Sequence, residues 1–229
     1  MPILKGQFSG KVLYLDGLRI QEIAHKSVSK GAPDQLILLE HPHVYTLGRR
    51  GKHQDILASP DVIQNLGLDV FETDRGGEVT YHGPGQLIAY PIVDLDRLKK
   101  GPIEFVRELE KLIISFLSIY HVSASSKKMP TGVWVGNKKI ASIGIKVSNR
   151  ITSHGLAINI NTNLSYFDHI IACGLIESQH TSLANETNKT HNLKKTAHQV
   201  AGELANILEM DLQWDSDPLD RPAPQTNLP

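Results

Sequence analysis

Short apolar runs occur along most of this chain, and these runs predict β-strands. Residues 34–42 (DQLILLEHP) form a nearly continuous apolar run, as expected of a buried strand. Residues 12–18 (VLYLDGL) are also rich in strand-forming side chains. Pro91 cannot donate to a sheet ladder, so we expect an edge strand or a bulge around it. The other predicted strands are 70–75, 86–95, 132–135, 138–148 and 154–161.

Helical periodicity is clearest in two segments. The first begins at Gly101-Pro102, with proline at the favoured first helical position, and its apolar residues recur every three or four positions. The second runs from about Leu193 to Met210, again with one apolar stripe. A further segment, residues 19–31, has a helix-like mixture that ends in a glycine. The two stripes are Phe105, Leu109, Leu112 and Phe116, and Ala197, Val200, Leu204 and Ile207.

The order of these elements indicates the fold class. Between the two clear helices several strands follow one another directly, which favours an α+β arrangement over a repeated βαβ unit. We therefore predict a single domain whose mixed, largely antiparallel central sheet is flanked by helices. The domain is expected to span residues 1–214. Residues 215–229 carry four prolines and few large apolar groups, and we expect a disordered tail there.

Composition and charge exclude several classes of function. Lysine plus arginine number 24 and aspartate plus glutamate 24, so the chain lacks the positive excess of a general nucleic-acid binder. No apolar run approaches the ~20 residues that span a bilayer, and no secretory signal pattern occurs at the start. The single cysteine cannot form an internal disulfide. These features together predict a cytoplasmic protein without nucleic-acid or membrane partners.

The densest chemical signal is the run RGGEVTYHGPGQ, from Arg75 to Gln86. It lacks the G-K-[ST] of a phosphate-binding loop, and a strand rather than a helix is predicted after it. Its glycines allow the backbone to approach a ligand closely, with Arg75 and His82 beside it. The alternative interpretation is a tight hairpin turn with both side chains in solvent.

Cys173 is either a buried packing residue or a nucleophile. Free cysteines are commonly buried and inert, whereas a reactive one needs a nearby cation or a helix N-terminus to lower its pKa. The candidate cations are Lys138, Lys139 and His154. For the two lysines the competing interpretation is a solvated hairpin end.

The eleven histidines do not form a recognisable metal motif. None belongs to H-E-x-x-H, and one cysteine excludes a thiolate-rich zinc site. We expect no metal. His41 and His43 are taken to shape a loop, and Arg49 and Arg50 either face an anionic partner or lie in solvent.

Five blocks together resemble the lipoyl(octanoyl) transferases of the biotin/lipoate protein ligase-like superfamily. The resemblance covers about residues 10 to 210. Two positions depart from the family pattern, because Ala172 and His43 stand where proline is common. The blocks are EHPHVYTLGRR, RGGEVTYHGPGQLIAYPIVDL, GVWVGNKKIASIGIKV, HGLAININ and ACGL followed by TSL.

The resemblance implies a reaction and a set of site residues. Family members move an octanoyl group from acyl carrier protein to a lysine of lipoyl domains, in 2-oxoacid dehydrogenase E2 subunits and in glycine cleavage H protein. The nucleophile, which forms a thioester acyl-enzyme, falls on Cys173, and the lysine that lowers its pKa falls on Lys139, with Lys138 as the alternative register. No cofactor is implied, because the acyl group arrives as a thioester. The implied substrate-binding residues are Arg75, Gly76, Gly77, Glu78, Val79, Thr80, Tyr81, His82, Ser142, Ile143, Gly144, Gly155, Leu156 and Ala157.

Further chemistry follows from that reaction. Backbone amides near Cys173 or at Gly76–Gly77 are candidates to hold the oxyanion, and Lys139 or His82 to accept the proton of the incoming amine. An eight-carbon chain also requires an apolar slot. Two alternatives remain: an ATP-dependent lipoate or biotin protein ligase, and a non-catalytic relative that binds lipoyl domains or acyl carriers. Cys173 within Cys-Gly and the intact HGPGQ argue against the first, and the presence of both Cys173 and Lys139 against the second.

Overall fold

The computed structural model describes residues 1–127, 131–172 and 179–214. Its strands within this part of the chain are β1 (Ile3–Lys11), β2 (Asp34–Glu40), β3 (Val44–Leu47), β4 (Asp69–Glu72), β5 (Val79–His82), β6 (Gln86–Ile92), β7 (Ser125–Ser126), β8 (Gly132–Val135), β9 (Lys138–Ser148), β10 (Ile151–Asn159) and β11 (Asp211–Trp214). The α-helices are α1 (Tyr14–Ser29), α2 (Pro60–Asn65), α3 (Pro102–Ser118), α4 (Leu183–Thr187) and α5 (Leu193–Ile207). The 3-10 helices that the structure describes over their whole length are η1 (His53–Asp55) and η2 (Leu164–His169).

The strands form one large and one small sheet. Within the described residues the large sheet has eight strands in the order β11-β1-β2-β6-β10-β9-β8-β7, and the small sheet has the order β4-β3-β5. Strand β1 is parallel to both of its neighbours and β3 is parallel to β4, whereas the other pairs are antiparallel. The predicted α+β class with a mixed, largely antiparallel sheet is therefore confirmed.

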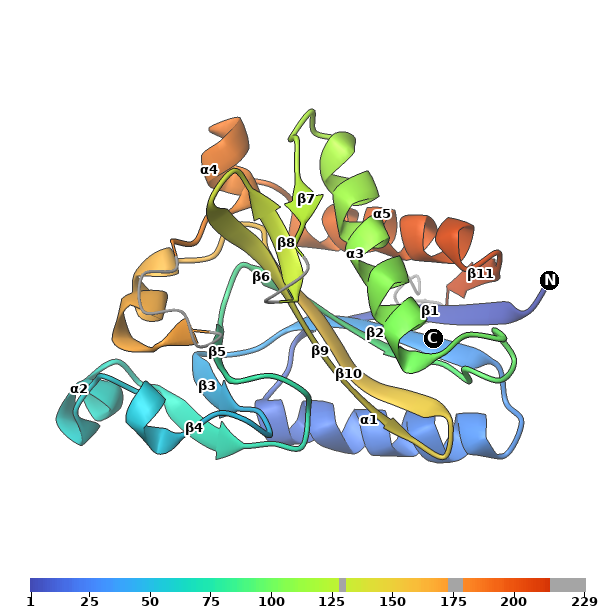
Figure 1. Cartoon of the computed structure of the whole chain (residues 1–229), viewed down its shortest axis with the longest axis horizontal. Helices are drawn as coiled ribbons and strands as arrows, with labels where there is room; N and C mark the ends of the chain where they lie inside the picture. Colours follow the sequence, from blue (N-terminus) through green and yellow to red (C-terminus); the bar gives the residue numbers. More distant parts are fainter. Residues whose placement is uncertain (128–130, 173–178, 215–229) are drawn as a thin grey trace, which may run out of the picture.

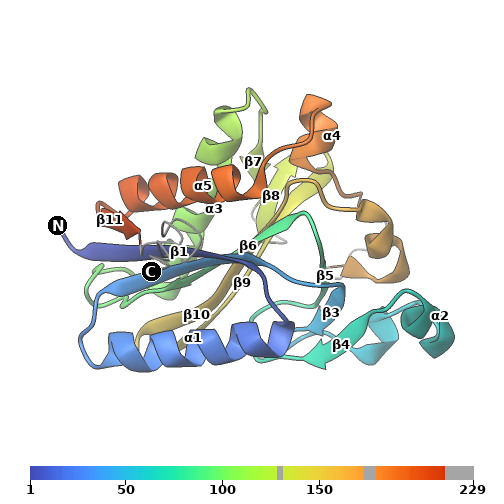
Figure 2. The same cartoon turned by 180° about the vertical axis from the view of Figure 1, so that it is seen from behind.

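Helices cover both faces of the large sheet (Figures 1 and 2). On one face α1 packs Ala24 and Val28 against apolar side chains of β2, β6 and β10. On the other face α3 and α5 pack against each other and over the main core. Burying both faces explains why the middle of β2 (Leu36–Leu39) and nearly all of β6 consist of apolar residues. A third cluster lies between the small sheet and η2.

Helix α1 corrects one prediction. Residues 12–18 have a strand-like composition, yet α1 begins at Tyr14 and continues through the segment that was predicted helical. The buried positions of α1 recur at helical spacing, whereas Leu13 and Leu15 are exposed. Packing of that one face against the sheet overrides the local strand preference. Strand β1 has no counterpart among the predicted elements.

Pro91 corrects another prediction, because β6 is central in the sheet rather than at an edge, and its pairing register shows no bulge at Pro91. The pairing of β6 with β10 opens at this point and resumes beyond it in the same register, at the Asp94–Ile151 bridge. The Thr152 hydroxyl donates to the Pro91 carbonyl at 2.6 Å and accepts from the Val93 N–H at 2.9 Å. A threonine side chain thus replaces the ladder where proline has no N–H to donate.

The other predicted strands and helices are present with shifted ends; for example, β4 ends at Glu72 and β6 at Ile92. Helix α3 starts at Pro102 and buries its predicted stripe, and α5 ends at Ile207, three residues before the predicted end. The proline-rich tail predicted at 215–229 lies outside the described residues. None of the helices described here is long and apolar enough to cross a membrane.

Candidate active site

A pocket of about 460 Å³ lies beside β9 and β10. Residues 75–78, which we call the glycine loop, form one of its walls. Strands β9 and β10 supply another wall, and Tyr14 of α1 and Tyr90 of β6 also line it. We call this space the glycine-loop pocket. It brings together segments that lie far apart in the sequence.

Nearly all residues that the sequence suggested for substrate binding line the glycine-loop pocket. Tyr81 is the exception, since it faces the opposite side of β5. Its ring stacks on Tyr166 with centroids 4.8 Å apart, and its hydroxyl is 2.8 Å from His43 Nδ1. Tyr81 alternates along β5 with Thr80 and His82, which do line the pocket, so its side chain points to the other face of the strand. The pocket-lining residues among those predicted are Arg75, Gly76, Gly77, Glu78, Val79, Thr80, His82, Ser142, Ile143, Gly144, Gly155, Leu156, Ala157 and Lys139.

Arg75 holds the glycine loop in shape. Its guanidinium donates to the carbonyls of Thr46 and Glu78, at 2.6 and 2.8 Å, and to the Gly76 carbonyl at 3.0 Å. The side chain is only 8% exposed, so these bonds lie largely out of water, where charge-assisted bonds are strong. The described contacts therefore assign Arg75 to building the pocket wall.

The glycine loop touches β9 at one point. The Gly76 N–H donates to the Ile145 carbonyl at 3.0 Å, and a Cβ on Gly144 would lie 2.6 Å from the Gly76 carbonyl oxygen. Only glycine at 144 therefore permits this approach. Because its N–H already has an acceptor, Gly76 is not available as an oxyanion donor. Gly77 has a φ of +96°, which other residues rarely adopt.

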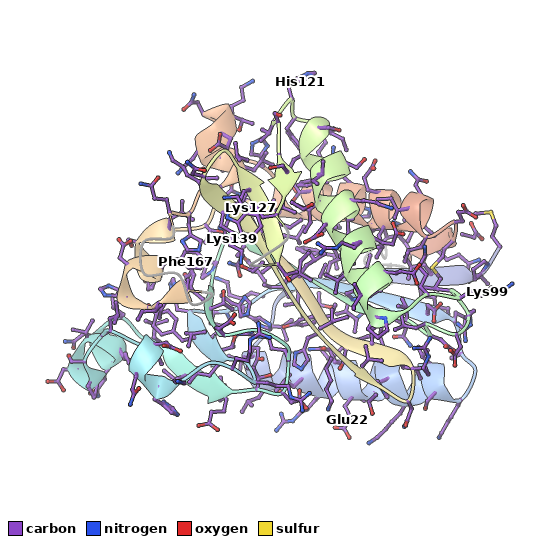
Figure 3. All side chains as sticks on the ribbon, viewed as in Figure 1. Glu22, Lys99, His121, Lys127, Lys139 and Phe167 are labelled. Carbon is purple, nitrogen blue, oxygen red and sulfur yellow. The ribbon has the colours of Figure 1, made fainter. Side chains whose placement is uncertain are left out.

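Lys139 and Lys138 occupy different environments at the start of β9. Lys139 is 1% exposed and lines the glycine-loop pocket, with its Nζ 5.3 Å from the centre of the Trp134 ring. Lys138 is exposed beside the tight turn between β8 and β9. Figure 3 shows Lys139 on the same side of the molecule as Phe167 of η2. Of the two lysines, Lys139 is the one that reaches the pocket.

Two backbone pairings hold the chain on either side of residues 173–178. Before them, the Ile171 N–H donates to the Asp55 carbonyl at 2.7 Å. After them, the Lys139 N–H donates to the Gln179 carbonyl at 2.8 Å, and the Thr181 N–H donates to the Lys139 carbonyl at 2.9 Å. The segment that follows residues 173–178 is thus paired with Lys139 itself. Cys173 lies outside the described residues.

His82 is a neutral group within a buried network. The Gln86 amide donates to Asn159 Oδ1 at 2.9 Å, so its Oε1 accepts from His82 Nδ1 at 2.8 Å. That places the proton on Nδ1 and leaves Nε2 as an acceptor. Burial, together with the nearby His41 and the Arg75 charge, lowers the pKa of His82 to about 3. A base this weak is a poor proton acceptor at neutral pH.

His41 is fully buried and packs against the rings of Tyr14 and Tyr90, which line the pocket. Its Nδ1 donates to the Val12 carbonyl at 2.7 Å, and its Nε2 accepts from the Tyr90 hydroxyl at 2.8 Å. Burial lowers the pKa of His41 to about 4, against about 6.5 for an unfolded histidine. Between these pH values the unfolded chain binds a proton that the folded chain does not. Stability present above pH 6.5 is therefore lost as pH falls towards 4.

We expect this effect to be measurable as a difference between variants. Between pH 7 and pH 5 the free energy of unfolding should fall by about 2 kcal/mol more in the wild type than in His41→Gln. Guanidinium unfolding at the two pH values measures this difference. His53→Gln, at an exposed histidine, is the matched control and should keep the wild-type dependence. An equal pH dependence for His41→Gln and wild type would contradict the assignment.

Several pocket residues were not found from the sequence. Tyr14 and Tyr90 carry no local signal, because one falls in a segment predicted as strand and the other inside a buried strand. His154 was considered only as a cation near Cys173. It pairs with Ile145, six residues along β9 from Lys139, and its Nε2 donates to Asp74 Oδ1 at 2.8 Å.

The remaining candidate residues lie around this site. Arg50 pairs with Glu78 at 2.8 Å at the rim of the pocket, and Arg49 is exposed. Among the described residues no group of three or more His, Cys, Asp or Glu side chains is arranged to hold a metal ion.

The sequence matches one protein family over most of its length. That family is described as the lipoyl protein ligase A/B catalytic domain, and the match spans residues 13–205. An octanoyltransferase of Solibacter usitatus is 50% identical over 204 residues, which cover 89% of this chain and 92% of that protein. A mitochondrial octanoyltransferase of Arabidopsis thaliana is 40% identical over 213 residues, covering 91% of each protein.

Solved structures show the same fold at low identity. A lipoate-protein ligase A bound with ATP superimposes with a TM-score of 0.75 at 14% identity, covering 92% of this chain and 88% of that one. A biotin protein ligase from Aquifex aeolicus gives a TM-score of 0.51 at 12% identity, over 91% of this chain and 69% of that one. At such identity the likeness concerns the fold. The sequence matches show that the chain belongs to the lipoyl protein ligase A/B catalytic-domain family and, within it, to the octanoyltransferases, which are acyltransferases.

Proposed function

We propose that this acyltransferase carries the octanoyl group as a thioester on Cys173, taking it from octanoyl-acyl carrier protein and passing it to a lysine of a lipoyl domain. Octanoyl transfer for protein lipoylation is the activity of the octanoyltransferases, the group within the family to which the chain belongs. The observation that carries the finer proposal is the burial of Lys139 in the glycine-loop pocket, paired with the chain that returns from Cys173. A lysine close to a cysteine favours the thiolate, which is the reactive form.

The first half-reaction loads the enzyme. The Cys173 thiolate attacks the carbonyl carbon of the donor thioester, and a new carbon–sulfur bond forms as the bond to the pantetheine sulfur breaks. The departing thiolate takes a proton from the Lys139 ammonium. The products are the octanoyl-enzyme, the carrier thiol and Lys139 as an amine. No ATP is consumed, because the donor is already activated.

The second half-reaction transfers the acyl group to nitrogen. The neutral amine of the acceptor lysine attacks the thioester carbonyl, and the carbon–nitrogen bond forms while the bond to Cys173 breaks. Lys139 accepts the proton that the nitrogen loses, which restores the starting pair. His82 is the weaker candidate for this role, because its pKa of about 3 makes it a poor base.

The glycine-loop pocket supplies the acyl slot in this proposal. Ile143, Leu156, Ala157 and Ile88 line it with apolar groups. Each methylene moved from water into such a slot contributes about 0.8 kcal/mol, so the seven alkyl carbons of an octanoyl group distinguish it from a short acyl group.

The partners follow from the proposed reaction. The donor is octanoyl-acyl carrier protein, and the acceptors are lipoyl domains of 2-oxoacid dehydrogenase E2 subunits and the glycine cleavage H protein. One related fold belongs to an archaeal lipoylation system described together with its E2 lipoyl domain. The single cysteine, which must stay reduced to react, fits a reducing compartment such as the cytoplasm.

The donor is tested by intact-protein mass spectrometry. Incubation with octanoyl-acyl carrier protein, without ATP, should add the mass of one octanoyl group, and an apo lipoyl domain should then discharge it. An enzyme that instead modified the lipoyl domain only from free octanoate plus ATP would be a ligase. That result would leave Cys173 as a packing residue and overturn the proposal.

The close approach of the glycine loop to β9 provides a second test. Gly144→Ala should reduce octanoyl transfer at least tenfold, because its methyl group would displace the Gly76 carbonyl and with it the pocket wall. Steady-state transfer to a lipoyl domain measures this loss. Gly202→Ala is the matched control, since nothing lies within 4 Å of the added methyl group in α5. It should keep full activity and gain about 1 kcal/mol of stability. Equal activity in both variants would contradict this account of the wall.

A further inference from the structure

A second cavity lies directly behind the glycine-loop pocket. Its volume is about 850 Å³, and it lies between α1, the end of β4 and the far part of the β9–β10 hairpin. Its lining includes Leu18, His25, Lys26 and Lys146. Among the described residues, His154 alone lines both spaces. His154 therefore lies at the boundary between the glycine-loop pocket and this larger space.

His154 is held firmly in this dividing position. Its ring Nε2 donates to Asp74 Oδ1 at 2.8 Å, and Asp74 Oδ2 accepts from Lys146 Nζ at 2.6 Å. Its backbone N–H donates to Gln21 Oε1 at 2.6 Å. The side chain is 6% exposed, so the ring fills the boundary rather than lying in solvent. The contact with Asp74 joins β10 to the segment that leads into the glycine loop.

The backbone of His154 is also unusual. Its φ is +57°, in the left-handed region that non-glycine residues seldom occupy. Residues held in such conformations cluster at functional sites, where surrounding contacts maintain them. A glycine would adopt this conformation without strain, yet the chain has a histidine here. The ring is therefore the feature that requires explanation.

The distance along the pocket matches the length of an octanoyl chain. Beyond Lys139, the pocket-lining residues of β9 begin at Ser142 and end at Ile145, which pairs with His154. From Ser142 to Ile145 the strand rises by about 3.3 Å at each residue, which covers roughly 10 Å. The seven carbon–carbon bonds of an octanoyl chain, each about 1.5 Å, span no more than ~10 Å. A chain whose carbonyl lies beside Lys139 and Ser142 therefore ends beside His154.

We propose that the His154 ring is the end wall of the acyl pocket and sets the upper limit of acyl chain length. The inference rests on the proposed function, because it takes the glycine-loop pocket as the acyl slot. Four further carbons lengthen the chain by about 5 Å and place its end within the space of the ring. Without the ring, that end enters the second cavity, beside Leu18 and the aliphatic stem of Lys146.

The test compares acyl groups of two lengths on the same carrier protein. Wild type, His154→Gly and His154→Asn are each given octanoyl- and dodecanoyl-acyl carrier protein, and transfer to an apo lipoyl domain is measured as kcat/KM. The ratio of dodecanoyl to octanoyl transfer should rise at least tenfold in His154→Gly, and by a smaller factor in His154→Asn. Asparagine tolerates the same backbone conformation and keeps part of the volume. A thermal unfolding curve establishes that each variant is folded.

Two control variants separate the end wall from other effects. His25→Ala removes an imidazole from the second cavity alone, and Asn149→Gly places glycine at an exposed turn residue with a φ of +49°. Both should keep the wild-type ratio. The inference would be overturned if the dodecanoyl-to-octanoyl ratio of either control rose as much as that of His154→Gly.

The outcomes distinguish this inference from the function on which it rests. A wild type that transfers octanoyl from carrier protein, with His154 variants folded and the chain-length ratio unchanged, overturns the end wall and leaves the proposed function standing. A wild type that accepts no acyl group from carrier protein overturns both. A raised ratio with octanoyl transfer retained supports both.

Discussion

Replacing Cys173 by serine should abolish octanoyl transfer, with a loss on the order of 10⁴-fold or more. The reason is that a serine hydroxyl is far less ionised at neutral pH than a thiol beside a lysine, so it cannot form the acyl-enzyme at a comparable rate. The measurements are transfer to an apo lipoyl domain and the intact mass after incubation with octanoyl-acyl carrier protein. The mutant should show neither product nor adduct.

The presence of a single cysteine provides a control for this experiment. The chain has one cysteine, so any adduct that is cleaved by hydroxylamine reports on Cys173 alone. A thermal unfolding curve like that of the wild type shows that the serine variant is folded. Robust turnover by the folded variant would rule out the covalent mechanism. Turnover from octanoate only when ATP is added would instead indicate a ligase.

Removing Lys139 should be the second most damaging change. Lys139→Ala is expected to lower octanoyl transfer by about 10²- to 10³-fold, within the range typical for loss of a positioned acid–base group. It should also raise the pH at which Cys173 is alkylated, because the cation that favours the thiolate is gone. Iodoacetamide alkylation, followed by mass spectrometry from pH 5 to pH 10, measures the second effect.

Lys138→Ala is the matched control for Lys139→Ala. The two lysines are adjacent, but Lys139 is buried in the pocket and Lys138 is exposed at the hairpin turn. Lys138→Ala should therefore leave both transfer and the alkylation profile unchanged. If Lys138→Ala shifted the profile and Lys139→Ala did not, the roles given to the two lysines would have to be exchanged.

Local sequence patterns predicted a helix or strand correctly where residues within that one element determined its structure. The apolar run of β2, the stripe of α3 and the strand that follows HGPGQ were all predicted from neighbouring residues. They failed where packing overruled them. Residues 12–18 became part of a helix because one face of α1 covers the sheet, and Pro91 was accommodated in a central strand by the Thr152 hydroxyl.

The candidate site divides in the same way. A continuous motif such as RGGEVTYHGPGQ marks the region of the pocket, but strand alternation turns Tyr81 away from it. The resemblance favoured Lys139 but left Lys138 as an alternative, and the structure distinguishes them because only Lys139 is buried. The end wall could not be predicted, because His154 meets Asp74 across 80 positions of the chain.

By itself, therefore, the sequence determined the fold class, the family, the glycine-rich segment and the presence of one possible nucleophile. Each of these depends on residue type, on short-range spacing or on the order of motifs along the chain. The tertiary structure alone decided which lysine faces the pocket, which motif residues line it and where it ends. Those outcomes depend on the pairing of β9 with β10 and on the contact of the glycine loop with Gly144, both of which join distant segments. Local preferences carry no information about such pairings, because their free energy arises only when the segments pack together.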